Sequence, residues 1–434
     1  MKNAQVVAVA LCTIINTMDG FDILAAAVTA PAIAGEWGLS PQELGLLLSS
    51  GLAGMTLGAL GVSPIADRWG RRRTVLLSLV LVALGMFGSA AAPGPALLMT
   101  SRLVTGAGVG TMMPTINTVV AEVSSRRRRD LSVCLQGAGF PLGGALGGIG
   151  AYLILGWDWR WLFGFGGLLA VLLVPPVLFW LPESIDFLVA RRPPGALMLL
   201  NRWLSRLGIE PLRELPRKHD ESETFVGIRR ALAGQLGISS LLICSSFFLL
   251  MFTFYFLTNW TPKLLTDYGL SERTGISGAI LMNLGGVTGD LLFTFLMLRW
   301  PASRMGPVFM SLCFATVLLF SVMPMTLTNL VPVSLLLGFL LFGSMLSLYA
   351  IVPTLYPASL RTTGTGLALG VGRIGAVIGP YTGGALVAAG LSRCQYLLLM
   401  AVPLPICALL AAYLSAHLAR SAQSMQSADS MLAR

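Results

Sequence analysis

Charged residues and histidines are scarce in this sequence. Of its 434 residues, 11% are charged and two are histidines, whereas soluble domains carry about 25% charged residues. The low charge excludes an ordinary soluble domain. The chain also contains no histidine pair, no Gly-x-Ser-x-Gly turn and no cluster of metal ligands, which are motifs of hydrolases and metalloenzymes. We therefore expect a protein that is not an enzyme and that uses no cofactor.

Cysteine pairs and a cleavable leader are also missing. The six cysteines lie singly in or beside apolar segments, without a Cys-x-x-Cys spacing, so we expect buried thiols and neither a disulfide nor a metal site. The first apolar segment begins soon after Lys2 and shows no small-residue cleavage site before the next one. We therefore interpret it as a retained membrane helix and not as a signal peptide.

Apolar residues, in contrast, are abundant and occur in long runs. They make up 55% of the chain, and the mean hydropathy is +0.79. Because a helix needs about 20 apolar residues to cross a bilayer, these runs predict an all-α membrane protein with twelve transmembrane helices. The predicted spans are 6–33, 44–66, 74–92, 96–122, 131–155, 161–181, 236–261, 275–298, 306–326, 331–355, 364–388 and 395–416.

Positive charge is distributed unevenly along the chain. If the N-terminus is cytoplasmic, 23 of the 29 lysines and arginines fall in cytoplasmic segments and four in outer loops. By the positive-inside rule, this asymmetry predicts that both termini are cytoplasmic, and it explains the net charge of +10 without a nucleic-acid partner. Arginine outnumbers lysine 26 to 3, which we interpret as the base composition of a GC-rich bacterial genome. We therefore expect a bacterial inner-membrane protein.

One long polar stretch divides the predicted spans into six and six. Residues 182–234 are rich in Arg, Glu and Pro, and we expect a cytoplasmic linker with some helix and no catalytic domain. The predicted domains are a six-helix half over 1–181, this linker, a second six-helix half over 235–419 and a cytoplasmic tail over 420–434.

Two carboxylates interrupt the first apolar segment. Asp19 and Asp22 lie one helical turn apart, and a charge near the middle of a membrane helix costs about 2.5–3.5 kcal/mol on insertion scales. Each must be compensated by a cation, a proton or water. Arg102 lies on the same side of the membrane as Asp22 and is a candidate partner, although an arginine there can also extend to the surface. We expect Asp22 to form the ion pair and Asp19 to carry the proton.

The loop after the second span carries a specific pattern. Residues 61–73 read Gly-Val-Ser-Pro-Ile-Ala-Asp-Arg-Trp-Gly-Arg-Arg-Arg, which resembles the Gly-x-x-x-Asp-Arg-x-Gly-Arg-Arg loop that locks the cytoplasmic side of major facilitator superfamily transporters. Arginines here can bind carboxylates or acidic lipid, and Glu122 is expected to pair with arginines of a neighbouring loop. We assign to this cytoplasmic gate Asp67, Arg68, Gly70, Arg71, Arg72, Glu122, Glu183 and Arg361.

An internal repeat places an arginine deep in the membrane. Gly-Ala-Gly-Phe at 137–140 in the fifth span corresponds to Gly-Val-Gly-Arg at 370–373 in the eleventh, as in transporters built from two parallel repeats with a site at the midplane. Arg373 lies about 14 Å into its span at 1.5 Å per residue, too deep to reach the surface easily. It therefore either forms a structural ion pair or binds a substrate anion, and Phe140 occupies the matching position.

Other polar and aromatic side chains within the spans are candidates for a substrate site. The aromatic stretch at 254–260 lies near the outer end of the seventh span, where it either gates the site or belongs to the interfacial aromatic belt. The candidate substrate-binding residues are Arg373, Phe140, Asn117, Asn259, Trp260, Asn283 and Asp290. The loop at 298–304 has Leu298 and Pro301 where a second gate motif would need an acid and a glycine, so we assign it no gating role.

Together these segments resemble the aromatic acid:proton symporter family of the major facilitator superfamily. The resemblance covers nearly the whole chain and rests on Asp-Gly-Phe-Asp at 19–22, the 61–73 loop, and residues 102–114, 259–262 and 355–380. It implies the two-half major facilitator fold and import of a benzoate-, hydroxybenzoate- or muconate-like acid, driven by the proton gradient. The implied partners are the organic acid, protons and membrane lipid, and we expect a monomer.

In this interpretation Arg373 binds the carboxylate of the substrate, and the rings of Phe140 and Trp260 stack on its ring. Two close carboxylates in a poorly hydrated site do not both stay ionised, so Asp19 and Asp22, with Arg102, couple the proton. Three alternatives stay open: a carrier of non-aromatic acids, a drug exporter of the same fold, and a transporter-like sensor that signals through the linker. The exporter is disfavoured because Phe140 interrupts the Gly-Pro signature that exporters carry on the fifth helix.

Overall fold

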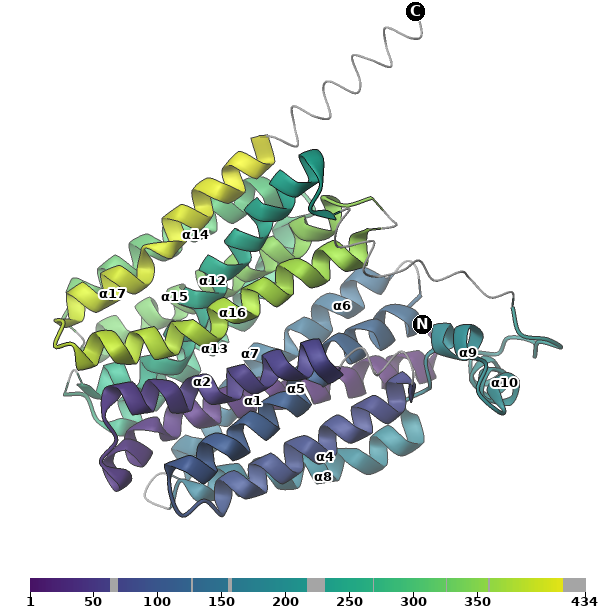
Figure 1. Ribbon diagram of the computed structural model, residues 1–434, viewed down its shortest axis with the longest axis horizontal. Coiled ribbons are helices and arrows are strands. Elements are labelled where there is room, and N and C mark those ends of the chain that lie inside the picture. The colour runs from purple at the N-terminus through teal and green to yellow at the C-terminus, as the bar shows by residue number, and fades with distance from the viewer. Residues whose placement is uncertain are drawn as a thin grey trace, which may run out of the picture.

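The structure is a bundle of long helices (Figure 1). The computed structural model describes residues 1–62, 69–125, 128–154, 158–216, 231–267, 269–324, 326–357 and 360–416. Within these ranges every regular element is a helix, and ten helices are long and apolar enough to cross a membrane. The two predicted spans outside these ten also form helices, at 129–153 and 361–388. The twelve-span prediction therefore agrees with the described chain.

Two groups of helices lie side by side, purple to blue and green to yellow in Figure 1. The first group comprises α1 (Asn3–Trp37), α2 (Pro41–Leu57) with a π-helical turn at Gly58–Val62, α4 (Arg71–Ala90), α5 (Pro95–Val123), α6 (Arg129–Gly137), α7 (Gly139–Leu153) and α8 (Arg160–Trp180). The second comprises α12 (Gly234–Asp267), α13 (Glu272–Leu296), α14 (Ala302–Val322), α15 (Leu327–Ile351), α16 (Arg361–Ala388) and α17 (Arg393–Ala401).

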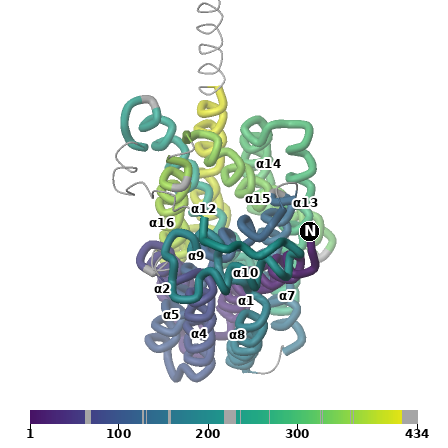
Figure 2. Tube along the Cα trace, turned by 90° about the vertical axis from the view of Figure 1, so that its right-hand side faces the viewer, coloured from purple at the N-terminus to yellow at the C-terminus, as the bar shows by residue number. Residues whose placement is uncertain are grey.

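Two short helices of the polar linker lie at the end of the bundle that carries the N-terminus (Figure 1). They are α9 (Ile185–Arg191) and α10 (Ala196–Arg206), which confirms the expected partial helix. Figure 2 looks onto this end, where α9 and α10 lie across the bundle. We call it the linker end, and the other the opposite end.

Serine residues begin several helices at the opposite end. Ser40 forms a capping box, in which its hydroxyl accepts from the backbone N–H of Glu43 and its own N–H donates to the Glu43 carboxylate. Ser271 accepts from the N–H of Thr274, and Ser392 forms a second capping box. These side chains satisfy backbone N–H groups that a helix start leaves without partners. The sequence thus fixes where α2, α13 and α17 begin.

The helix of the fifth predicted span, 131–155, is interrupted once. It consists of α6 and α7, separated at Ala138 between two glycines. Glycine favours such an interruption because it loses more conformational entropy in a helix than other residues do.

Close packing between α1 and α7 depends on glycines. A Cβ on Gly20 would overlap the carbonyl oxygen of Phe140, and a Cβ on Gly143 would overlap that of Thr17. Gly139 is similarly close to Thr13, with an ideal Cβ 2.7 Å from its carbonyl oxygen. Small residues allow helix backbones to approach in this way in membranes. Gly20, within the Asp-Gly-Phe-Asp motif, is therefore required for packing.

The two groups are joined at the opposite end. Gln42 Nε2 donates to the Tyr381 hydroxyl at 3.1 Å, and Ser49 Oγ donates to the Val377 carbonyl at 2.7 Å. The guanidinium of Arg273 lies 5.9 Å from the ring centre of Tyr152. These contacts connect α2 with α16 and α13 with the end of α7, so helices of both groups meet directly there.

Replacing Gly20 with alanine is expected to destabilise the protein by about 1–3 kcal/mol, the usual cost of overpacking, because α1 and α7 must move apart. Thermal unfolding in detergent measures this effect. Gly35→Ala is the matched control on the same helix, since a Cβ there has no neighbour within 4 Å. Equal melting temperatures for the two variants would contradict the packing role of Gly20.

Candidate functional site

Four consecutive residues of α1 face four different neighbours. Because successive helical residues are rotated by about 100°, residues 19–22 point around the whole helix. Gly20 packs against α7, and Phe21 lies 6.1 Å from the ring of Phe165 on α8. Asp22 faces α5, and Asp19 faces the second group of helices. One helical turn therefore contains two residues that pack against neighbouring helices and two acidic residues that face different groups of helices.

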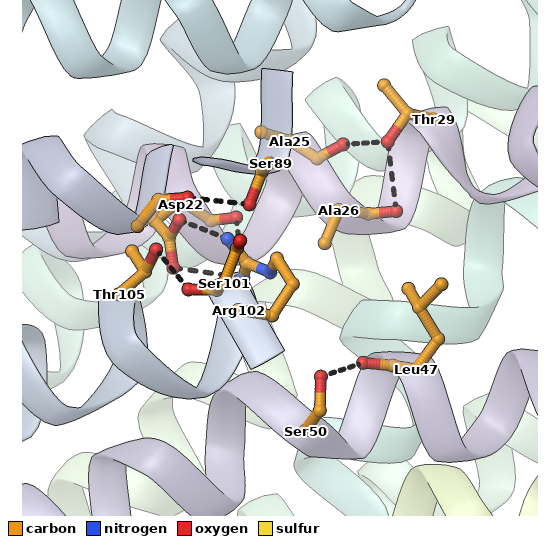
Figure 3. Close-up of polar contacts among 11 residues, drawn as sticks. Asp22, Ala25, Ala26, Thr29, Leu47, Ser50, Ser89, Ser101, Arg102 and Thr105 are labelled. Carbon is orange, nitrogen blue, oxygen red and sulfur yellow. Dashed lines mark hydrogen bonds and ion pairs between the residues drawn. The ribbon is translucent and has the colours of Figure 1, made fainter. Parts of the chain in front are cut away.

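Asp22 forms a buried ion pair with Arg102, as the sequence predicts (Figure 3). Both terminal nitrogens of the guanidinium donate to the carboxylate, with Nη2 3.0 Å from Oδ2. The two side chains are only 2% and 4% exposed. The ring of Phe163 lies 5.7 Å from the guanidinium carbon, and Gly51 leaves space for Nη2. The arginine therefore stays inside the bundle and does not extend to the surface.

Asp19 has no comparable partner. It is 1% exposed, and neither carboxylate oxygen accepts a hydrogen bond from the described part of the chain. Its electrostatic neighbours include Arg373 and Asp22, one attractive and one repulsive. An ionised carboxylate without hydrogen bonds is costly to bury. An ionised Asp19 is therefore costly at this position.

Arg373 of α16 lies between the two groups of helices. Its Nη1 donates to the Tyr255 hydroxyl at 3.2 Å and approaches the sulfur of Met55 on α2 at 3.8 Å. It also interacts electrostatically with Asp19 and Tyr349. A guanidinium has five N–H donors, and within the described residues its hydrogen bonds involve Nη1 only. Donors thus remain for a carboxylate.

Aromatic rings connect Phe140 with Arg373. The ring of Phe140 lies 6.1 Å from that of Phe342 on α15, which lies 4.9 Å from Phe254 on α12. Phe254 in turn lies 5.2 Å from Tyr255, the hydrogen-bond partner of Arg373. We call these four residues the aromatic row. It extends from α7 of the first group into the second.

Part of the 254–260 stretch lies deeper in the bundle than the sequence predicts. Tyr255 lies at Arg373 and not at an outer gate. Trp260 is 1% exposed, and its ring nitrogen donates to the Pro380 carbonyl at 3.0 Å. This hydrogen bond connects α12 with α16. Asn259 is also buried, and its amide donates to the backbone of Tyr255. Trp260 and Asn259 therefore contribute to helix packing, and their contact with a substrate stays a prediction.

Three further predicted residues lie apart from one another. Asn283 is buried at the contact of α13 with α7, where its side chain packs on Gly144. Asp290, half-buried one to two turns nearer the linker end, interacts electrostatically with Tyr349. Asn117 is exposed on α5. Sequence analysis missed Tyr349 and Phe342, which belong to no motif. The only available signal was an aromatic residue in an apolar span.

The predicted gate residues form a capping network within the first group and the linker. Glu183 accepts from the backbone N–H groups of Arg71 and Arg72 at 2.7 and 3.2 Å. Gly70 has a φ of +99°, and a Cβ there would lie 2.6 Å from the Glu183 carboxylate. Only glycine suits that position. The carboxylate thus caps the start of α4.

Glu122 caps a linker helix and is also attracted by one arginine of the 61–73 loop. Its carboxylate accepts from the Ser184 hydroxyl at 2.9 Å and the Ile185 backbone N–H at 3.1 Å, which caps α9, while Arg71 contributes a weaker attraction. Arg361 is exposed at the start of α16. Asp67 and Arg68 lie outside the described residues, so a lock between the halves stays a prediction.

Comparison with known proteins decides the family. A family model described as Major Facilitator Superfamily matches residues 9–380. The chain belongs to the Major Facilitator Superfamily. This membership confirms the predicted fold and the prediction of a multi-pass membrane protein. The family consists of transporters and not of enzymes.

Relatives within the superfamily carry aromatic acids. The 4-hydroxybenzoate transporter PcaK of Pseudomonas putida is 33% identical over 91% of this chain and 89% of its own length. The gallate transporter of Pseudomonas putida is 30% identical, over 91% and 88%. The 3-(3-hydroxy-phenyl)propionate transporter of Escherichia coli (strain K12) is 29% identical, over 88% and 87%. The predicted resemblance to aromatic acid transporters is therefore confirmed.

Solved structures of the superfamily share the fold. The xylose transporter XylE from E. coli, in a partially occluded inward open conformation, superposes with a TM-score of 0.72 over 94% of this chain and 98% of that one. Its sequence identity is 16%, so this similarity concerns the fold alone.

Asp22→Asn is expected to destabilise the protein by about 3–5 kcal/mol, because it leaves the buried guanidinium of Arg102 without its countercharge. A double variant, Asp22→Asn with Arg102→Met, should recover most of this loss. Asp19→Asn should cost less than Asp22→Asn, since Asp19 accepts no hydrogen bond from the described residues. Melting temperatures in detergent compare the three. A larger loss for Asp19→Asn would refute the division of roles.

Proposed function

We propose that the protein imports an aromatic carboxylate together with at least one proton. The observation that carries this proposal is the position of Arg373 at the end of the aromatic row, where it interacts electrostatically with Asp19. Among the described residues, Arg373 keeps donors without a partner and the Asp19 carboxylate accepts no hydrogen bond. The transport of gallate and hydroxybenzoates by relatives with about 30% identity supports this substrate class.

In the proposed site, Arg373 holds the substrate carboxylate and the aromatic row contacts its ring. Guanidinium and carboxylate match in geometry and form paired, charge-assisted hydrogen bonds. Rings prefer tilted or offset contacts with a centroid separation of about 4.5–7 Å, and the row already shows this geometry. Tyr255 orients the guanidinium through its hydroxyl.

Proton coupling follows because Asp19 and the substrate carboxylate share one cation, Arg373. In the empty site, Asp19 and Arg373 attract each other. A substrate anion that takes the guanidinium leaves two carboxylates near one cation in a buried site, which favours protonation of Asp19. Substrate and proton then move as a neutral pair. The Asp22–Arg102 pair is internally balanced and holds α1 in place meanwhile.

We infer that the linker end faces the cytoplasm of a bacterial cell. The basic loops gather at this end, as the positive-inside rule requires, and hydrogen bonds between α2 and α16 join the groups toward the opposite end. In this arrangement, the two six-helix halves, 1–181 and 235–419, move relative to each other. The site at Arg373 and Asp19 then opens alternately to the two sides of the membrane.

Uptake by proteoliposomes tests the function. We expect a panel of benzoates, hydroxybenzoates, phenylpropionates and open-chain dicarboxylates to show accumulation of the aromatic acids only, and only when the outside is more acidic. Accumulation that is independent of the pH gradient would refute coupling. Preference for open-chain acids would refute the substrate class.

Arg373→Lys is expected to raise the KM for the aromatic acid roughly 10- to 100-fold, because paired hydrogen bonds to a charged group contribute about 1.5–3 kcal/mol and lysine cannot reproduce them. Arg299→Lys, at an exposed position at the linker end, is the matched control and should leave KM unchanged. An unchanged KM in Arg373→Lys would argue against carboxylate binding there.

Asp19→Asn is expected to abolish accumulation against a gradient, because the asparagine side chain cannot take up a proton. Exchange of labelled for unlabelled substrate across the vesicle membrane should persist, since it needs no net proton movement. Both quantities are measured in the same proteoliposomes. Concentrative uptake at the wild-type level would show that another group carries the proton.

A further inference from the structure

A cavity of about 550 Å³ lies at the linker end, away from Arg373 and Asp19. Its walls are the start of α4, the end of α8, and the linker helices α9 and α10. Arg72 and Glu183 of its lining also belong to the predicted cytoplasmic gate, but the proposed site for substrate and proton does not include the cavity. We call it the arginine cavity because four arginines line it: Arg72, Arg73, Arg202 and Arg206.

The charges of the arginine cavity are unbalanced. Among the described residues, Glu183 is the one acidic member of the lining, and its carboxylate already accepts from the backbone N–H groups of Arg71, Arg72 and Ser184. Arg202 and Arg206 lie four residues apart on α10, where like charges repel. The Nε of Arg72 is buried and has no hydrogen-bond partner among the described residues. Such an environment favours an anion.

One side of the same cavity is apolar. Leu178, Phe179 and Leu199 line it, and Phe179 is 72% exposed. Trp180, the last residue of α8, is 54% exposed. Aromatic residues at the end of a membrane helix mark the headgroup level of the bilayer. The cavity therefore opens at the depth where phosphate groups of lipids lie.

We propose that the arginine cavity binds the headgroup of an anionic phospholipid. The phosphate lies between the arginines of α4 and those of α10, and the acyl chains leave over the apolar side toward the bilayer. A basic helix with exposed apolar residues, such as Met198 and Leu199 on α10, is typical of a membrane surface contact. The bound lipid joins the linker helices to α4 and α8.

Native mass spectrometry of the full-length protein in detergent tests this proposal, with phosphatidylglycerol and phosphatidylcholine titrated separately. We expect tighter binding of phosphatidylglycerol, and a roughly 10- to 30-fold loss of that affinity in the double variant Arg202→Gln/Arg206→Gln. Arg128→Gln/Arg129→Gln is the matched control, because both residues are exposed and lie outside the cavity. Arg202→Lys/Arg206→Lys should retain most of the affinity.

Three results would overturn the proposal. Equal binding of the two lipids would show no preference for an anionic headgroup, and an equal loss in the two glutamine variants would show a general charge effect. Displacement of phosphatidylglycerol by an equal concentration of glycerol 3-phosphate would identify a site for soluble phosphates. Unchanged melting temperatures in the variants confirm that binding, and not folding, is compared.

Discussion

Two carboxylates in one turn of an apolar helix require two different solutions, and the structure provides both. Asp22 forms an ion pair with Arg102 inside the first group of helices, with both side chains almost fully buried. This pair leaves Asp19 without a local cation. Among the described residues, Asp19 is attracted by Arg373 in the second group of helices. The charge balance of the first half therefore depends on how the second half is placed.

Packing determines where these charges meet. Gly20 and Gly143 bring α1 and α7 into backbone contact, and Gly144 receives the side chain of Asn283 from α13. The Asp-Gly-Phe-Asp motif is thus a structural unit in which glycine sets the helix separation and the two acids serve different groups of helices. Any substitution that widens the α1–α7 contact is also expected to move Asp19 relative to Arg373.

The sequence predicts the features that follow from the energetic cost of a buried charge and from the depth of that charge in the membrane. An arginine in the outer part of a span and an acid on the same side make the Asp22–Arg102 pair a clear expectation, and the internal repeat indicates Arg373. Helix contacts are harder to predict because almost every residue of a span is apolar, so periodicity does not distinguish a lipid-facing from a buried side chain. Trp260, Phe342 and Tyr349 illustrate this limit. Their roles depend on neighbours more than 60 residues away or on other helices.

The most direct test of the account is proton uptake on substrate binding by the purified protein in weak buffer. An aromatic acid that is fully ionised at neutral pH releases no proton itself, so linkage predicts uptake of up to about one proton for each substrate bound. We predict that Asp22→Asn retains this uptake and that Asp19→Asn binds substrate without it. Equal uptake by Asp19→Asn and the wild-type protein, or none in the wild-type protein, would contradict the sharing of Arg373 between Asp19 and the substrate.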